Sequence, residues 1–567
     1  MTVRDPAENR THDFQKLAQT GLDVRSPFHS TLQKARRRLA TGAAEPEANM
    51  VGILNNGNEA LLWRLHLIRH AKTSIDIQTF IWTHDEVGEL VLTELIKAAR
   101  RGVRVRLIAD HFGVPRNLNV VAHLTTVDPN IKIKIYRPPA MALMANPIAR
   151  TIHMASDFKG ANQRMHNKTF IVDGVVGITG GRNYENTYYN QSPRLNYKDR
   201  DAVVVGPAAT QMLNSFERFW ASRHSVASHD LPDVGRAIEK LKSNPIRVVG
   251  SKAWIRRISK EADGMSALRN GIATGMRLAG HTEYLSDRPG KNDSPLLTGS
   301  GRHTDQLSSR VSSAKEEIVI QSPYLILSRR GARFFRRMHQ EQPNLSIVVS
   351  TNSLGSTDNL LAYSANVRQR ELFVHDLGFQ IHEYKPQPAD LRRVLPQYDE
   401  LEHRSREDEP FLCIHGKSIV IDETTTYVGT FNLDPRSENL NTEGGLMVRD
   451  PAIARSVKAD ILRDISPGNS WTMAPILTSD AAALTSKVDN IGRFVEDLLP
   501  LDIVPPLNSI CAFDLLPGKT AMPPGHSNFY RNYRNVGRWP NQYGKMTDKE
   551  IVTRLLHTMV KSATPLF

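Results

Sequence analysis

Two stretches of the sequence decide the fold: RMHNKTFIVDGVVGITGGRNYEN at residues 164–186 and CIHGKSIVIDETTTYVGTFNLD at residues 413–434. Each contains a histidine with a lysine two residues later, an aspartate seven residues later and an asparagine seventeen residues later. The two sets are His166, Lys168, Asp173 and Asn183, and His415, Lys417, Asp422 and Asn432. Both stretches are rich in isoleucine, valine, phenylalanine and threonine, which favours β-strands. Residues i and i+2 of a strand point to the same face, so each imidazole should lie beside an ammonium group.

Together the two motifs predict a site for phosphodiester chemistry. Strands that face each other would bring two histidines, two lysines and two asparagines around one pocket. Lysine and asparagine can hold the non-bridging oxygens of a phosphodiester and stabilise the charge of its five-coordinate transition state. One imidazole can attack phosphorus while the other protonates the leaving oxygen. A single His-x-Lys on a strand is usually a surface pair or a packed histidine, but duplication at matched spacing favours catalysis.

Each histidine also needs a carboxylate that fixes its tautomer. In the second half the sequence NTEGGLMV offers Glu443, which we expect to support His415. The matching strand of the first half is YKDRDAVVV, which sets Asp199 opposite Glu443. Asp199 is therefore expected to support His166, with Asp201 as the alternative.

The aspartates of the motif are candidate catalytic residues with a second interpretation. Asp173 and Asp422 stand at strand ends beside turns. Such positions favour a structural role over a catalytic one.

The sequence before the first motif predicts a βαβ unit. Ser74–Trp82 (SIDIQTFIW) alternates β-branched and aromatic residues as a strand does. Val87–Arg101 repeats apolar residues at helical spacing, and Gly102 follows as a C-cap. Val103–Ala109 (VRVRLIA) is the next strand. Strand, helix and strand of these lengths indicate an α/β fold with a mixed, largely parallel sheet.

A repeat of this pattern predicts two domains. The octet AKTSIDIQ at residues 71–78 returns as AKEEIVIQ at 314–321, a shift of 314 − 71 = 243 positions. The motifs recur at nearly the same offset, 415 − 166 = 249. A shift this large indicates a duplicated domain rather than a solenoid. We expect an N-terminal basic extension over 1–45, a first domain over 46–280, a second domain over 281–468 and a C-terminal extension over 469–567.

The composition favours an anionic partner. The chain has 567 residues and a net charge of +14, which suits nucleic acid, an acidic membrane surface or a phosphorylated substrate. Its two cysteines, Cys413 and Cys511, exclude a disulfide scaffold and a cysteine-based zinc site. No apolar run approaches the roughly 18–20 residues that span a bilayer, and the N-terminus lacks the apolar core of a signal peptide. These features predict a soluble or peripheral cytoplasmic protein.

The motifs and their surroundings resemble the phospholipase D superfamily, whose HxKxxxxD signature both copies satisfy. SPYLILS at 322–328, TNSLGSTDN at 351–359 and FNLDPRSENLNTEGG at 431–445 resemble bacterial cardiolipin synthases, most of all the cardiolipin synthase C type. The resemblance runs from about residue 50 to 465. It implies two tandem α/β/α sandwich domains related by a pseudo-twofold axis, with the active site between them.

The resemblance also assigns roles. It implies that His166 is the nucleophile that forms a phosphohistidine and that His415 is the general acid, then the base. Phosphate would be bound by Lys168, Lys417, Asn183, Asn432 and Thr430. No metal or other cofactor is expected.

For partners, the resemblance implies phosphatidylglycerol, with phosphatidylethanolamine as a further candidate, at an anionic membrane surface. We expect a monomer peripheral to the inner membrane, because one chain carries both motif copies, and we expect no nucleic acid. The first half has Gly181 where the second has Thr430, so one hydroxyl contact to phosphate is expected to be missing there.

Three alternatives stay open on the residues alone. Water could take the intermediate in place of an alcohol, which would make a phospholipase D, or the chain could be a nuclease of the same superfamily. A catalytically silent binding protein is disfavoured by two intact motifs. The segment His526–Lys545 interleaves aromatic and basic residues and contains no acidic one, which suits a lipid headgroup interface, single-stranded nucleic acid or packing on the catalytic domains.

Overall fold

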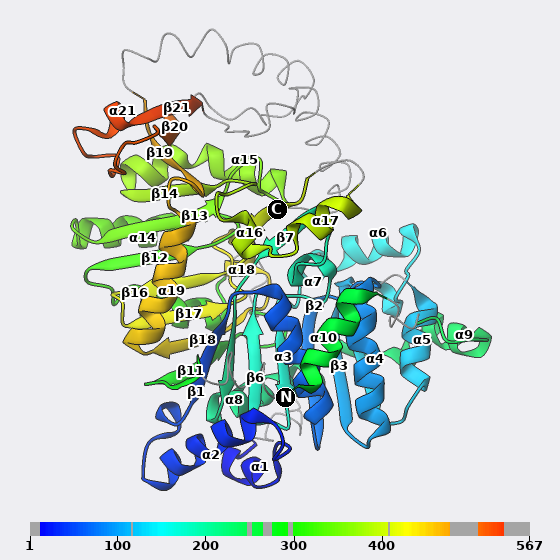
Figure 1. The fold of residues 1–567 in the computed structure, drawn as a ribbon. Helices are drawn as coiled ribbons and strands as arrows, with labels where there is room; N and C mark the ends of the chain where they lie inside the picture. The colour runs from blue at the N-terminus through cyan, green and yellow to red at the C-terminus, as the bar shows by residue number, and fades with distance from the viewer. Residues whose placement is uncertain are drawn as a thin grey trace, which may run out of the picture.

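A computed structural model of the chain describes residues 12–114, 117–246, 252–264, 275–292, 299–405, 409–476 and 509–537. Figure 1 shows two α/β domains in contact, the first at the lower right and the second at the upper left. Among the described residues, no helix is long and apolar enough to cross a membrane.

The first domain is built on a sheet that has nine strands within the described ranges. Their order across the sheet is β10 (Arg277–Leu278), β1 (Met50–Leu54), β8 (Asp201–Val205), β6 (Val176–Gly180), β5 (Thr169–Val172), β2 (Ser74–Ile81), β3 (Arg104–Gly113), β4 (Ile131–Tyr136) and β9 (Ser225–Ala227).

The second domain repeats this order, with ten strands in its described part. They are β11 (Thr282–Ser286), β18 (Gly444–Arg449), β17 (Thr425–Gly429), β16 (Ser418–Ile421), β12 (Glu317–Gln321), β13 (Ser346–Asn352), β14 (Phe379–Tyr384), β19 (Ser470–Pro475), β20 (Ile510–Leu515) and β21 (Tyr533–Gly537). Strand by strand, β1, β8, β6, β5, β2, β3 and β4 correspond to β11, β18, β17, β16, β12, β13 and β14. The duplication predicted from the repeated octet is therefore confirmed. In each copy the octet begins three residues before a strand and continues into it, and the two strands, β2 and β12, are equivalent.

Both sheets are mixed, as expected, but the expectation that they are largely parallel is wrong. Parallel pairing joins β2 to β3 and β3 to β4 in the first sheet, and β12 to β13 and β13 to β14 in the second. The other neighbours within the two sheets are antiparallel. The reason is local: β5 and β6, like β16 and β17, are joined by tight hairpins, and a hairpin forces antiparallel pairing.

The βαβ unit matches its prediction closely. β2 occupies Ser74–Ile81, and α4 runs over Glu86–Arg100 with the Asp85 side chain accepting a hydrogen bond from Gly88 N. Gly102 has a φ of 91°, the left-handed conformation that ends a helix at least cost on glycine.

Two helices lie between the sheets. α8 (Pro207–Ala221) packs on the first sheet and also contacts β11 of the second, while α19 (Pro451–Asp464) packs on β16 and β17 and also contacts β1. Their apolar faces join one hydrophobic core to which both domains contribute, for example Phe216 of α8 and Ile461 of α19. Burial of this shared core fixes the two domains against each other.

The outer face of each sheet is covered by further helices. On the first domain these are α3 (Gly57–His70), α4, α5 (Leu118–Thr126), α9 (Pro232–Lys240) and α10 (Ala253–Asp263). On the second they include α13 (Arg302–Val311), α14 (Arg329–Glu341) and α15 (Leu360–Arg368). Shorter helices in loops are α6 (Pro147–Ser156), α7 (Phe158–Asn162), α16 (Leu391–Val394), α17 (Tyr398–Arg404), α18 (Pro435–Asn439) and α21 (Phe529–Asn532).

Neither end of the chain is the simple extension expected from the sequence. α1 (Phe14–Thr20) and α2 (Pro27–Ala40) bury Phe14, Phe28 and Leu32 in the core of the first domain. At the other end, β19, β20 and β21 lengthen the second sheet by antiparallel pairing. The basic residues of α2 lie on its exposed side. Their number made the segment look like an exposed extension, although the opposite side of the helix is apolar and buried.

The aromatic tail divides in the same way. Phe529 and Tyr533 pack against Phe513 in a small core beside β20, which is the packing alternative. Residues 538–545 of the tail lie outside the described residues.

Candidate active site

The two His-x-Lys motifs stand at the start of equivalent strands. His166 and Lys168 immediately precede β5, and His415 and Lys417 immediately precede β16. All four side chains are buried, with residue exposures of 8% and 3% in the first half and 7% and 1% in the second. Buried cations and imidazoles of this kind need partners or a ligand.

His166 is held by a carboxylate from the other domain. Nδ1 of His166 lies 2.9 Å from Oε2 of Glu443. Glu443 is fully buried and is itself fixed by the hydroxyl of Ser437, which donates to its Oε1 at 2.7 Å. A hydrogen bond at Nδ1 leaves Nε2 as the free ring nitrogen.

His415 is held by the reciprocal contact. Its Nδ1 lies 2.7 Å from Oδ2 of Asp199, which belongs to the first domain and is 3% exposed. The expected pairs are therefore wrong in one respect. Asp199 and Glu443 do support the two histidines, but each supports the histidine of the other half.

Pairing of chain segments across the domain boundary causes this exchange. The backbone N–H of His166 donates to Thr442 O at 3.0 Å, so the first motif lies beside the residue that precedes Glu443. In the same way β15 (Phe411–Ile414) pairs in parallel with β7 (Leu195–Lys198), which ends one residue before Asp199. Each histidine is thereby set opposite the acid of the partner domain.

Two polar residues at the ends of equivalent strands fix the chain in front of each histidine. Asp110, in β3, accepts a hydrogen bond from Met165 N at 2.8 Å. Asn352, at the end of β13, accepts one from Ile414 N at 2.8 Å. These residues position the histidines and went unrecognised in the sequence. The signal that could have found them is their place at the carboxyl ends of parallel strands, where α/β folds carry their sites.

The lysines lie beside the histidines, as the strand geometry predicts. Lys168 Nζ donates to the carbonyl oxygen of His166 at 2.8 Å and lies 5.5 Å from the centre of the Phe80 ring. Lys417 Nζ lies 2.9 Å from Nδ1 of His415. Both ammonium groups therefore lie in the same buried cluster as the imidazoles.

Burial sets the charge state of these groups. Burial and, to a lesser degree, the nearby Lys417 lower the pKa of Lys168 to about 7, against the attraction of Glu443. Burial also lowers the pKa of Lys417. The pKa of His166 is well below its usual value because of burial and of both lysines. Such a concentration of positive groups favours an anion in the pocket.

The two carboxylates differ in charge. Burial raises the pKa of Glu443 to about 7, in spite of Lys168 and the hydroxyl groups around it. Burial acts in the same direction on Asp199, but the charge of His415 and its hydrogen bond outweigh it and hold the pKa of Asp199 well below the usual range. Asp199 thus stays ionised to a lower pH than Glu443 does, and it is the carboxylate that contacts His415.

The two asparagines of the motif have different surroundings. Asn183 Oδ1 accepts from Ile81 N at 3.0 Å, and its Nδ2 donates to the hydroxyl of Tyr188 at 2.8 Å. Asn432 is 6% exposed, and its Oδ1 has no hydrogen-bond partner within the described part of the chain. An amide oxygen accepts and cannot bond a phosphate oxygen, so this Oδ1 suits a ligand donor such as a hydroxyl. Phosphate binding through Nδ2 stays a prediction for both asparagines.

Thr430 and Gly181 occupy equivalent positions beside the two acids. The hydroxyl of Thr430 donates to Oε2 of Glu443. A Cβ placed on Gly181 would lie 2.2 Å from Oδ1 of Asp199, so no side chain fits there. Thr430 therefore supports the carboxylate of Glu443, and its expected contact to phosphate stays a prediction.

The remaining candidate aspartates have structural partners. Asp173 accepts hydrogen bonds from the backbone of residues 72–74, and Asp422 accepts them from the backbone of residues 315–317. The structural interpretation of both thus agrees with their contacts. Asp201, the alternative to Asp199, is fully buried against Arg64 and Arg182 instead of a histidine.

Aromatic side chains contact both histidines. Phe80 presents its ring edge-on to His166, with centroids 5.2 Å apart. Tyr188 and Tyr197 contact the His415 ring at 5.0 and 4.6 Å. Phe80 is in β2, near the carboxyl end of a parallel strand, whereas Tyr188 lies between β6 and β7 and Tyr197 is in β7. Of the three aromatic residues, only Phe80 could have been predicted from the sequence, because its strand end is where α/β folds carry their sites.

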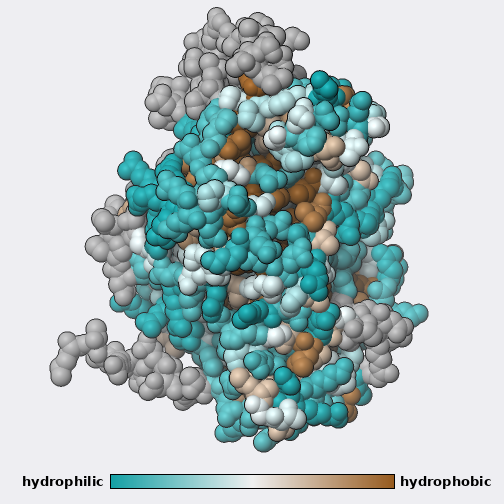
Figure 2. All heavy atoms as spheres, turned by 90° about the vertical axis from the view of Figure 1, so that its left-hand side faces the viewer, coloured by the Kyte–Doolittle hydropathy of each residue, from teal (hydrophilic) through white to brown (hydrophobic). Residues whose placement is uncertain are grey.

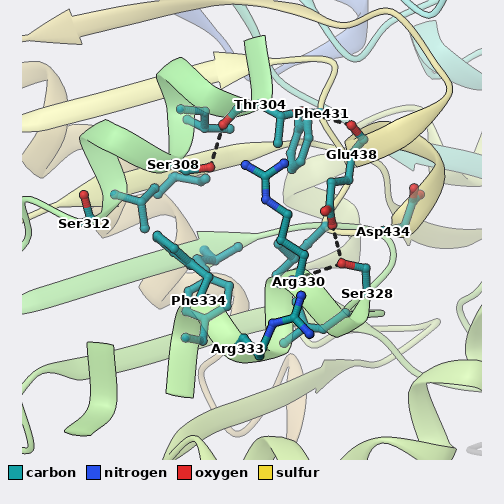
Figure 3. Close-up of a pocket in the computed structure, with 18 of the residues that line it drawn as sticks. Thr304, Ser308, Ser312, Ser328, Arg330, Arg333, Phe334, Phe431, Asp434 and Glu438 are labelled. Carbon is teal, nitrogen blue, oxygen red and sulfur yellow. Dashed lines mark hydrogen bonds between the residues drawn. The ribbon is translucent and has the colours of Figure 1, made fainter. Parts of the chain in front are cut away.

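A separate hollow of about 720 Å³ lies on the outer face of the second domain, and its lining contains neither histidine. Figure 3 shows Arg330 and Arg333 of α14 beside Phe334, opposite Ser308 of α13. Figure 2, which faces the side that carries α14, shows hydrophobic residues in a hollow among hydrophilic ones. The hollow has a simple cause: the equivalent helix of the first domain, α4, buries eleven residues, whereas α14 buries two.

Both halves of the chain match a known protein family. The family model described as "Cardiolipin synthase, PLD-like domain" matches residues 65–220 and 307–465. The chain belongs to this family. Both motifs, both carboxylates and both parallel strand sets lie within the matched ranges.

Two curated relatives of this cardiolipin synthase family match most of the chain. An uncharacterized protein of Helicobacter pylori (strain ATCC 700392 / 26695) is 30% identical over 423 residues, which cover 73% of this chain and 79% of the relative. Cardiolipin synthase C of Escherichia coli (strain K12) is 28% identical over 411 residues, which cover 71% of this chain and 82% of the relative. Among solved structures, phosphatidylserine synthase of Haemophilus influenzae Rd KW20 matches with a TM-score of 0.48 and 14% identity, over 77% of this chain and 91% of that one.

Proposed function

We propose that the chain is a phosphatidyltransferase that forms cardiolipin from phosphatidylglycerol and a second phospholipid through a phosphohistidine. One observation carries the proposal: the two histidine–carboxylate pairs are made across the domain boundary, at 2.9 and 2.7 Å, in one buried cluster with two lysines. Membership of the PLD-like cardiolipin synthase family supports a phospholipid as the substrate.

In the first step Nε2 of His166 attacks the phosphorus of the donor lipid. The bond from phosphorus to the leaving headgroup oxygen breaks, and His415 gives its Nε2 proton to that oxygen. The headgroup alcohol leaves, and the phosphatidyl group stays bound to His166. Lys168 and Lys417 hold the non-bridging oxygens, whose charge grows in the transition state.

The charges of the two carboxylates support this assignment of roles. Burial and Lys417 lower the pKa of His415, and Asp199, which stays ionised, acts against them and stabilises the protonated form that a general acid needs. Glu443, whose pKa is raised to about 7, stabilises a second proton on His166 less well. His166 therefore keeps a free Nε2 lone pair and suits the role of nucleophile.

The second step reverses the first with a different alcohol. The hydroxyl of an acceptor lipid loses its proton to Nε2 of His415 and attacks phosphorus, and the bond between phosphorus and His166 breaks. With phosphatidylglycerol as donor and acceptor, the products are cardiolipin and glycerol. Water in place of the acceptor would give phosphatidic acid.

We further infer that the chain meets its lipids from the surface of a membrane, in the cytoplasm and as a monomer. The net charge of +14 suits an anionic surface. One chain carries both halves of the site, so no second copy is needed to complete it.

Purified chain incubated with labelled phosphatidylglycerol, with and without phosphatidylethanolamine, tests the proposal. Labelled cardiolipin should form with wild-type protein and should not form with His166→Ala. Phosphatidic acid as the only labelled product would replace the transferase by a hydrolase. Cleavage of plasmid DNA without lipid turnover would make the chain a nuclease of the same superfamily.

The role of each histidine needs a trapping experiment. In His415→Asn the leaving oxygen is not protonated, so a donor with a good leaving group, such as a p-nitrophenyl phosphatidyl ester, should label His166 and stop there. An alkaline quench and mass spectrometry of the peptides locate the label. Label on His415 in His166→Asn, with none on His166 in the first variant, would exchange the two roles.

A further inference from the structure

Large apolar side chains that stay exposed are concentrated in one part of the molecule. Nine such residues occur within the described ranges: Val24, Phe112, Met141, Met144, Ile148, Ile152, Phe158, Leu278 and Leu462. Six of the nine lie between residues 112 and 158, and Ile148 is the most exposed of all at 73%. Scattered apolar residues need no explanation, but a local concentration marks an interaction site.

These six residues are called here the apolar rim. Five of them follow the backbone around α6, and the sixth, Phe112, is in β3 next to His111, whose Nε2 lies 3.0 Å from Leu143 O. Ile148 and Ile152 are four residues apart and so lie on the same side of the helix, with exposures of 73% and 63%. Met141 and Met144 precede the helix, and Phe158 begins α7 directly after it. α6 stands at the edge of the first domain in Figure 1, where it contacts chiefly its own neighbours in sequence.

The rim segment is anchored to the domain rather than loosely attached. The buried carboxylate of Asp233 accepts hydrogen bonds from Leu143 N at 3.1 Å and Met144 N at 2.7 Å. Two residues of the same stretch, Ala140 and Met141, have φ values of 50° and 53°, a conformation that costs free energy on any side chain. Strained backbone that the surroundings hold in place is typical of functional segments.

Aromatic rings connect the rim to the candidate active site. Phe112, 61% exposed, stacks on Phe80 with centroids 5.9 Å apart and an interplanar angle of 9°. Phe80 in turn contacts the His166 ring edge-on at 5.2 Å. An apolar surface thus runs from solvent to the histidine that we propose as nucleophile.

The charge of the segment selects the partner. Residues 137–156 contain two arginines and no aspartate or glutamate. The next residue, Asp157, is acidic, and its carboxylate lies 3.9 Å from the guanidinium of Arg137. An apolar helix side in a stretch this poor in carboxylates fits the boundary between headgroups and acyl chains of an anionic bilayer. A bilayer also explains why this surface lies next to the histidines. A lipid substrate resides in the bilayer, so the surface that binds the bilayer must adjoin the active site.

We propose that the apolar rim inserts into the headgroup layer of a phospholipid bilayer and admits a lipid headgroup to His166 along Phe112 and Phe80. The proposal rests on the function proposed above and names the element through which the membrane is met. It assigns to α6 a role that neither the motifs nor the family match specifies.

Vesicle flotation of the full-length chain tests the insertion. The vesicles contain phosphatidylglycerol and phosphatidylethanolamine, and the variant is Ile148→Ser/Ile152→Ser. Removal of the two apolar side chains should weaken vesicle binding by about tenfold or more for each isoleucine. The matched control is Leu278→Ser/Leu462→Ser, which removes two exposed leucines elsewhere and should bind as wild type does. Equal loss in both variants, or no loss in the first, would overturn the proposal.

A second readout separates this proposal from the proposed function. On phosphatidylglycerol in vesicles the variant should lose transfer in proportion to its lost binding. On a short-chain phosphatidylglycerol below its micellar concentration, variant and wild type should turn over equally. If wild type turns over neither vesicular nor short-chain phosphatidylglycerol, the proposed function is wrong. The flotation experiment still tests whether the apolar rim binds the bilayer.

A reporter at the rim distinguishes a bilayer from a second copy of the chain. Tryptophan in Ile152→Trp should show a blue-shifted emission upon addition of vesicles and should be quenched by brominated acyl chains. Sedimentation of wild type without lipid should give a monomer. A dimer that Ile148→Ser/Ile152→Ser dissociates, with no quenching by brominated lipid, would assign the rim to self-association and overturn the proposal.

Discussion

Oε2 of Glu443 lies 2.9 Å from Nδ1 of His166, although the two residues come from different halves of the chain. Asp199 and His415 make the reciprocal contact at 2.7 Å. Each half thus supplies a histidine to one pair and a carboxylate to the other. The pocket exists only when both domains are assembled, which ties catalysis to the shared core around α8 and α19.

The first prediction concerns the loss of the negative charge of Asp199. In Asp199→Asn the negative charge that stabilises protonated His415 is removed, so the pKa of His415 falls. The rate of a step that needs protonated His415 should then decline at a lower pH than in wild type, and kcat should fall by roughly a thousandfold. A pH–rate profile for transfer from phosphatidylglycerol measures both effects.

Glu443→Gln provides the contrast for that experiment. It acts on His166, which must be unprotonated to attack, so it should move the acidic limb of the profile to lower pH and leave the basic limb in place. If Asp199→Asn moved the acidic limb and Glu443→Gln the basic one, His166 and His415 would have exchanged roles.

The chemistry of the site could be predicted from the sequence because it depends on local geometry. His166 and Lys168 are two residues apart in the extended chain just before β5, and that spacing alone places them together. The partner of each histidine depends on a long-range contact, the hydrogen bond from His166 N to Thr442 O, and no spacing within one copy contains this information. Comparison of the copies found Asp199 and Glu443 but assigned each to its own half.

The parts of the fold that are not duplicated were the hardest to predict. Phe28 and Leu32 of α2 are fully buried. The arginines that follow them in the same helix make the segment basic overall, so its composition predicts an exposed extension instead of a packed helix. The strands β20 and β21 lie after the last motif, with no repeat to indicate their sheet. The second copy also lacks the close helix cover of the first, which opens the hollow beside Arg330.

A second prediction follows from the lowered pKa of Lys168. The ammonium form of Lys168 should be half populated near pH 7 in the empty pocket, because burial and Lys417 lower its pKa to about 7. An anion binds the charged form, so binding of sulfate, which does not titrate in this range, should weaken about tenfold for each pH unit above 7. Competitive inhibition by sulfate between pH 6 and 9 measures this slope. In Lys168→Gln sulfate should bind more weakly at pH 6 and with a flatter slope; an unchanged slope would place the titration on another group.

A third prediction concerns the space beside Asp199. In Gly181→Ala the new Cβ would lie 2.2 Å from Oδ1 of Asp199, so the carboxylate must move away from His415. Activity should fall nearly as far as in Asp199→Asn, and overpacking should cost about 1–3 kcal/mol of unfolding free energy. Turnover and urea denaturation measure the two effects. Gly235→Ala is the control, because nothing lies within 4 Å of its new Cβ in α9, and it should keep full activity. Full activity in Gly181→Ala would mean that Asp199 need not hold its position.

The last prediction separates Asp201 from the catalytic acids. Asp201 is fully buried, with Oδ2 at 2.9 Å from Arg64 and 3.2 Å from Arg182. Asp201→Asn leaves two buried guanidinium groups short of a counter-charge, which should cost about 3–5 kcal/mol of unfolding free energy. The matched control, Asp305→Asn, breaks the exposed pair with Arg330 and should cost about 0–1 kcal/mol. Denaturant unfolding of both variants measures the difference. At a temperature where Asp201→Asn remains folded, its pH–rate profile should keep the limbs of wild type, because Asp201 touches neither histidine. A displaced limb would show that Asp201 acts through Asp199 on His415.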